Sequence, residues 1–85
     1  MDSSQKFAKE RALFEEKRTT EWHLTQEEGT WVVLVDGDIH SIHAPYNLYE
    51  AYKHAFGTHR PFLIKEMRKD GTGIEYAYNP EHDND

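Results

Sequence analysis

The residues with the richest chemistry are the histidines, of which there are six in a chain of 85 residues. Imidazole nitrogens bind zinc, nickel and copper, and a nearby carboxylate can complete the set of ligands. His40, His43 and Asp38 lie close together in the sequence and are the candidates for a metal or small-ligand site. Positions i and i+3 of a strand point to opposite faces, so His40 and His43 converge only if the strand ends or bulges between them. We therefore expect solvated or hydrogen-bonded histidines, no tight divalent-metal site and no cofactor.

Catalytic chemistry has weak support in the sequence. Asp36 and Asp38 could act as a carboxylate pair for acid–base work, but aspartates around a glycine are also typical of a hairpin turn. The chain has no cysteine. It also contains no glycine-rich phosphate loop, no G-x-S-x-G motif and no H-E-x-x-H motif. We expect a protein that is not an enzyme.

Tyrosines are the candidates for binding a partner. Tyr46 and Tyr49 should lie off the buried face of a helix, and Tyr76 and Tyr78 alternate with polar residues in the last expected strand. Exposed tyrosines suit interfaces because they bury a large area at low entropic cost. If that last strand is an unprotected edge, it could pair with a second copy or with a partner strand. The alternative is that these rings pad the edge of the core.

Composition and charge exclude several classes of protein. A net charge of −6 weighs against direct binding to nucleic-acid phosphates, which requires clustered Lys and Arg. Acidic side chains gather in residues 21–38 and 72–85, where they could steer a basic partner. No apolar run approaches the roughly 20 residues of a membrane span, and the N-terminal residues lack the apolar stretch of a secretory signal. We expect a cytoplasmic protein without membrane contact.

The elements that must position these side chains can be read from apolar periodicity. Residues 19–25 are ambiguous, because Trp22 and Leu24 fit either the end of a helix or an alternating strand, and we favour the helix. Residues 31–35 are apolar at every position, so both faces of this strand would be apolar. This suggests a central strand covered on both faces, or on one face with a partner on the other. The expected helices span residues 3–24 and 47–57, and the expected strands span 31–35, 39–43, 62–67 and 74–78.

These elements predict a single small α+β domain in the order αββαββ. We expect an antiparallel-rich sheet of four strands with both helices on one face. The other face would carry polar residues, histidines and some tyrosines. The domain should cover residues 1–79, and residues 80–85 should form a disordered acidic tail.

The middle of the chain follows a pattern of helix, G-x-W-V strand, D-G turn, second helix and F-L-I strand. The residues that carry it are Gly29 to Ile39, Leu48 to Tyr52 and Pro61 to Ile64, within a span of about 10–67. The pattern resembles a family of small bacterial and archaeal domains of unknown function. The resemblance implies the fold and a prokaryotic source, and it implies no activity because the family has none assigned.

Three functions therefore stand as hypotheses. The first is a non-enzymatic accessory module that binds a protein, or a second copy of itself, through Tyr46, Tyr49, Tyr76 and Tyr78. The second is a metal- or small-ligand-binding domain that uses His40, His43 and Asp38. The third is an acidic inhibitor that mimics nucleic acid on a basic enzyme. An exposed aromatic patch would favour the first, converging imidazoles the second, and a face of carboxylates spaced like phosphates the third.

Overall fold

A four-stranded antiparallel sheet with the strand order β2-β1-β3-β4 organises the chain. The computed structural model describes residues 6–80; the start of the expected first helix, residues 3–5, and residues 81–85 of the expected tail lie outside this range. The elements in chain order are α2 (Ala8–Lys17), η1 (Arg18–Trp22), α3 (His23–Thr25), β1 (Thr30–Val35), β2 (Asp38–His43), α4 (Leu48–Gly57), β3 (Phe62–Met67) and β4 (Glu75–Tyr78). The predicted small α+β class with an antiparallel sheet is confirmed. None of the helices in residues 6–80 is long and apolar enough to cross a bilayer.

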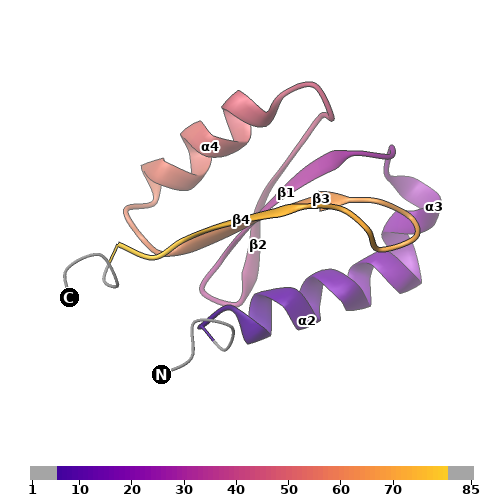
Figure 1. Ribbon diagram of the computed structural model, residues 1–85, viewed down its shortest axis with the longest axis horizontal. Helices are drawn as coiled ribbons and strands as arrows, with labels where there is room; N and C mark the ends of the chain where they lie inside the picture. The colour runs from indigo at the N-terminus through magenta and orange to yellow at the C-terminus, as the bar shows by residue number, and fades with distance from the viewer. Residues whose placement is uncertain (1–5, 81–85) are drawn as a thin grey trace.

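The helices lie on opposite faces of the sheet (Figure 1), so the prediction that both cover one face is wrong. Along β1, Val32 and Leu34 pack with the N-terminal helical segment, whereas Trp31, Val33 and Val35 pack with α4. The physical reason is the apolar run itself, because side chains of both parities must leave water and each face therefore needs its own cover. The expected open face of polar residues, histidines and tyrosines is consequently replaced by a second core.

Strands β1 and β2 are joined by a two-residue turn. Asp36 and Gly37 both have positive φ, 55° and 75°, which is the type I′ geometry that matches the twist of a hairpin. Glycine adopts this region without strain, and aspartate tolerates it better than most residues. Asp36 thus lies in the turn, and Asp38 begins β2 with its carboxylate accepting a bond from the Ile39 N–H, which fits the hairpin interpretation of the sequence.

The N-terminal segment is helical through the ambiguous residues 19–25, but it is not α-helical throughout. Residues Arg18–Trp22 form a π-helical insertion between α2 and α3. Phe7, Phe14 and Trp22 are all buried against the sheet, although they are spaced by seven and then eight residues. In an α-helix, seven residues complete almost two turns, while an eighth rotates the side chain by about 100° out of line. The extra residue taken up by the π turn restores Trp22 to the buried face.

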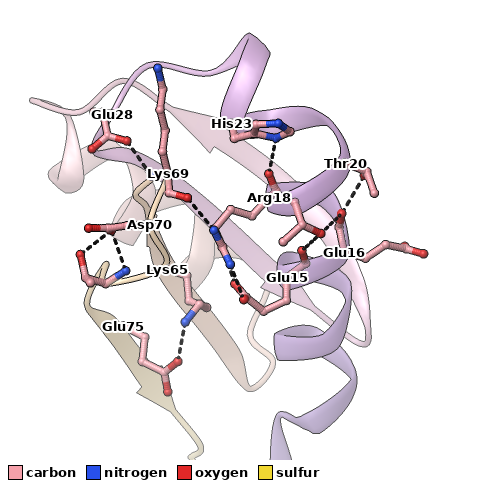
Figure 2. A network of polar contacts seen from close by, with 12 residues as sticks. Glu15, Glu16, Arg18, Thr20, His23, Glu28, Lys65, Lys69, Asp70 and Glu75 are labelled. Carbon is pink, nitrogen blue, oxygen red and sulfur yellow. Dashed lines mark hydrogen bonds and ion pairs between the residues drawn. The ribbon is translucent and has the colours of Figure 1, made fainter.

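Side chains around the π insertion satisfy its displaced carbonyl groups and tie it to the β3–β4 connection. Thr20 Oγ1 donates to the Glu16 carbonyl at 2.7 Å, and His23 Nδ1 lies 2.9 Å from the Arg18 carbonyl oxygen. Figure 2 shows Arg18 between Glu15 and the connection, where its Nη1 donates to the Lys69 carbonyl at 2.6 Å. These bonds hold the segment that positions Trp22.

Two buried or half-buried charges dock α2 on the sheet. Glu10 accepts a 2.7 Å hydrogen bond from the Gly37 backbone N–H in the β1–β2 turn. Glu75 of β4 pairs with Arg11 at 2.7 Å and with Lys65 at 3.1 Å, and the bond from Arg11 is the main cause that lowers the pKa of the Glu75 carboxyl. The face of β4 that carries Glu75 is therefore occupied by the N-terminal helix.

Candidate functional site

Helix α4 builds two different surfaces at its flanks. Ala51 and Ala55 face the sheet and are fully buried, and their small side chains let the helix approach the strands closely. Glu50 and His54, which lie one helical turn apart, point to the β2 flank, whereas Tyr52 and Phe56 point to the β4 flank. The first flank is polar and the second is aromatic, so they suit different ligands.

A bulge in β2 brings the imidazoles together. Val33 is opposite Ser41, but Leu34 is opposite Ile39, so His40 is the extra residue of the bulged strand. This is the condition under which His40 and His43 can share a face. The His43 ring lies 4.9 Å from the His54 ring, centroid to centroid. His40 lines an open hollow of about 410 Å³ together with Glu50, Lys53, His54, Gly57 and Thr58.

In this imidazole cluster, by which we mean His40, His43, His54 and Glu50, the surroundings of His43 favour its neutral form. Burial lowers the pKa of His43 below its ordinary value, and the neighbouring His54 and His40 lower it further, while Glu50 acts in the opposite direction. His43 Nε2 lies 2.8 Å from Ser41 Oγ. His54 Nε2 lies 3.8 Å from Glu50 Oε2. The cluster therefore combines proton-accepting nitrogens with one carboxylate.

Asp38, the third member of the trio proposed from the sequence, lies elsewhere. Its carboxylate accepts a 3.0 Å bond from the Ile39 N–H at the hairpin. It lines a separate hollow of about 500 Å³ with Asp36, His40 and Arg60 among its neighbours, and Asp36 is paired with Arg60 at 2.7 Å. Within residues 6–80, no three His, Asp or Glu side chains are already arranged to hold a metal ion.

Glu50 and His54 belong to the cluster but were not singled out from the sequence. Their spacing of four residues on an amphipathic helix was a usable signal, since i and i+4 side chains are neighbours on a helix. What the spacing could not supply was the neighbouring strand. His43 reaches them only because α4 crosses over β2 on the same face of the sheet.

The His43 pKa shift predicts a pH dependence of stability. Because the folded-state pKa lies below the unfolded value of about 6.5, the unfolded chain binds the proton more readily and the free energy of unfolding falls as pH drops through this value. The loss should level off below the folded-state pKa. Urea denaturation at pH 7.5, 6.5 and 5.5 measures it. We expect His43→Gln to show a smaller decrease over this range than the wild type, with the exposed His59→Asn as the matched control; equal pH slopes in the wild type and His43→Gln would contradict it.

The tyrosines divide into exposed and packed members. Tyr46 and Tyr49 are 90 % and 74 % exposed, and Tyr76 is 37 % exposed. Tyr78 is packed instead, with its ring 5.0 Å from Phe56 and 5.3 Å from Phe62. The alternative that the tyrosines pad the core therefore fits Tyr78 best. Phe56, which was not among the candidates chosen from the sequence, is 49 % exposed.

The aromatic surface is continuous between α4 and β4. Tyr49, Tyr52 and Phe56 follow one another at spacings of three and four residues along α4, and Tyr52 stacks on Phe56. Tyr76 lies 5.7 Å from Tyr52 and 6.0 Å from Trp31. We call Tyr49, Tyr52, Phe56 and Tyr76 the α4–β4 aromatic surface; the packed Tyr78 supports it through its contact with Phe56.

Strand β4 is an edge of the described sheet and has backbone groups that point away from β3. The Glu66 N–H donates to the Ile74 carbonyl at 2.9 Å, so Ile74 faces its partner strand. In an antiparallel ladder the facing residues alternate. Tyr76 and Tyr78 therefore bond inward to Ile64 and Phe62, their register partners, and the N–H and C=O groups of Glu75 and Ala77 point outward.

Comparison of the chain with protein-family models, with curated proteins and with solved structures found no match. The resemblance to a small domain family of unknown function stays a prediction. The function is accordingly argued from the geometry of these two surfaces.

Proposed function

We propose that this chain is a small non-enzymatic binding module whose partner is a protein. The observation that carries the proposal is the α4–β4 aromatic surface beside an unpaired strand edge. Tyr49, Phe56 and Tyr76 expose large rings at fixed positions on regular elements, and rigid aromatic rings are the side chains that most often dominate binding energy. Such rings remain partly wet in the free protein, and covering them releases that water.

The partner is an extended segment that adds to β4. The outward N–H and C=O groups of Glu75 and Ala77 offer main-chain hydrogen bonds to an incoming strand, and alternate side chains of that strand would fall on the α4 face. There they meet Tyr76, with Phe56 and Tyr52 behind it. On the opposite face they meet Glu75, which is already paired with Arg11 and Lys65.

The net charge of −6 supports steering of a basic partner toward this module. Many of its carboxylates are paired, as Glu15 is with Arg18 and Glu66 is with Arg68, and each face of the sheet carries a helix. This arrangement gives little support to the nucleic-acid mimic, which needs an open face of carboxylates. Charge steering predicts that association slows as salt rises, while dissociation changes little.

Site-specific photocrosslinking tests the proposed surface. A photoreactive residue at position 49 or 76 should capture the partner in the cell that produces the protein, whereas the same residue at position 16, which is exposed on α2, should not. With the captured protein purified, Tyr76→Ser and Tyr49→Ser should each raise the dissociation rate by about tenfold or more, with association rates unchanged.

Sedimentation of the isolated protein tests whether the partner is a second copy of the same chain. A mass that rises with concentration in the wild type, and not in Tyr76→Ser, would support pairing through β4. Two results would overturn the proposal for a protein that sediments as a monomer. One is crosslinking of the same proteins by photoreactive residues at positions 16, 49 and 76. The other is a complex whose dissociation rate is unchanged by both tyrosine substitutions.

A further inference from the structure

The imidazole cluster on the β2 flank of α4 has donor spacings close to those of a zinc site. Two ligand atoms about 2.0–2.1 Å from a tetrahedral zinc ion lie about 3.3 Å apart, and the centroids of two imidazoles bound to it lie about 5 Å apart. Here His54 Nε2 and Glu50 Oε2 are 3.8 Å apart, and the rings of His43 and His54 have centroids 4.9 Å apart. The backbone therefore places three donor-bearing residues next to one another on α4 and β2.

The hydrogen bond of His43 has the form of an outer-shell contact. A histidine that binds a metal usually donates its other ring N–H to an oxygen, which sets the tautomer and orients the ring. His43 Nε2 lies 2.8 Å from Ser41 Oγ. With the proton on Nε2, the ring donates to Ser41 and keeps the Nδ1 lone pair for a metal. Ser41 shares the face of His43, because the two flank a single residue of β2.

We propose that His43, Glu50 and His54 bind a divalent transition-metal ion of the zinc class, with His40 in the same hollow as a further donor. This replaces the sequence-based expectation that no tight site forms, which rested on a regular strand through His40 and His43. The bulge at His40 removes that argument. The set of imidazoles plus one carboxylate is chemically suited to zinc.

The donors close on the metal by rotation of side chains and without a change of fold. Within residues 6–80, three donors do not yet converge on one point. The side chains of His54 and Glu50 are 52 % and 38 % exposed, so they can exchange rotamers freely at the rim of the hollow. His43 is oriented by its 2.8 Å contact with Ser41 Oγ, so His54 and Glu50 are the donors that move.

Neutral imidazole is the form that binds a metal. Burial and the neighbouring rings disfavour a proton on His43. The one opposing group, Glu50, is itself a proposed ligand. A proton and the metal therefore compete for the same nitrogens, and binding must weaken as pH falls.

Calorimetric titration of the tag-free full chain with zinc chloride at pH 7.5 tests the proposal. We expect one ion per chain and a dissociation constant in the micromolar range or tighter. Loss of an outer-shell partner commonly weakens metal binding 10- to 100-fold, so His54→Ala and Glu50→Gln, which each remove a ligand, should weaken it by at least about tenfold. The matched control is His59→Asn, an exposed histidine outside the hollow, which should bind as the wild type does.

Two further measurements distinguish zinc binding at this cluster from zinc binding elsewhere on the chain. Imidazole NMR signals of His43 and His54 should shift on addition of zinc, and binding should be lost at pH 5.5. Tyr76→Ser should leave zinc binding unchanged, so failure of the protein-binding surface and failure of this site are distinguishable. Absence of binding at millimolar zinc, or equal binding by the wild type, His54→Ala and Glu50→Gln with circular dichroism showing that all are folded, would overturn the proposal.

Discussion

Replacing Trp31 with alanine should lower the free energy of unfolding by about 3–5 kcal/mol, the usual range for removal of a large buried aromatic side chain. Trp31 lies on the central strand and is only 6 % exposed. Its ring packs in the core under α4, and its Nε1 donates to the Pro45 carbonyl at 3.0 Å. The substitution leaves a cavity under α4 and removes the bond that holds the start of the β2–α4 connection.

This loss is a large fraction of the total, because the free energy of unfolding of natural proteins is commonly about 5–15 kcal/mol. Urea denaturation followed by far-UV circular dichroism measures it. Trp31→Phe is the control, since it keeps most of the apolar volume but loses the Nε1 bond, and it should cost clearly less than the alanine variant. A loss below about 1 kcal/mol in Trp31→Ala would contradict the packing described here.

Single-residue deletions in the N-terminal helix should differ sharply according to whether they fall before or inside the π insertion. Ala12 and Thr20 are both exposed, so neither deletion removes a core side chain. Deleting Ala12 rotates Phe7 and Phe14 relative to each other by about 100°, so one of the two must leave the core. We expect a loss of about 3 kcal/mol or more in the free energy of unfolding.

Deleting Thr20 should be tolerated within about 1 kcal/mol. It reduces the spacing of Phe14 and Trp22 from eight residues to seven, which an unbroken α-helix aligns on one face. The contact between the two rings, 5.5 Å between centroids and edge to face, can then persist without a π turn. The lost bond from Thr20 to the Glu16 carbonyl is exposed and is not needed in a regular helix.

Thermal and urea denaturation of the two deletion variants beside the wild type give the comparison. If deletion of Thr20 costs as much as deletion of Ala12, the π turn does not serve the alignment of Trp22. If it costs little, the insertion follows from residue spacing alone, and no functional role for it is required. π turns are common at functional sites, so this distinction decides how the segment is interpreted.

Much of the fold follows from local patterns in the sequence. The strand over residues 31–35, the Asp36-Gly37 turn and the helix that begins near Asn47 all depend on side-chain periodicity and turn preferences, and the structure contains each of them. Periodicity succeeds here because each element buries residues that lie close in the sequence. The tyrosines were also recognisable as candidates, although Tyr78 proved to be packed.

Only the tertiary structure decided which helix covers which face of the sheet. The apolar run in β1 required cover on both faces, but the thin stripe of the first helix did not reveal which face it would take. That stripe depends on Trp22, which joins Phe7 and Phe14 only through the π turn. Helix geometry inside a packed protein responds to the partner surface, so a non-standard turn cannot be derived from helix periodicity alone.

Formation of the imidazole cluster likewise depends on contacts between residues that are distant in the sequence. Taken alone, the sequence around His40 and His43 predicts side chains on opposite faces. The bulge that brings them to one side is set by the register of β2 against β1, and Glu50 and His54 arrive from α4 after a turn and a crossover. The sequence by itself determined which donors exist and which elements carry them; strand register and helix packing determined that they meet, because both arise from pairings between segments far apart in the chain.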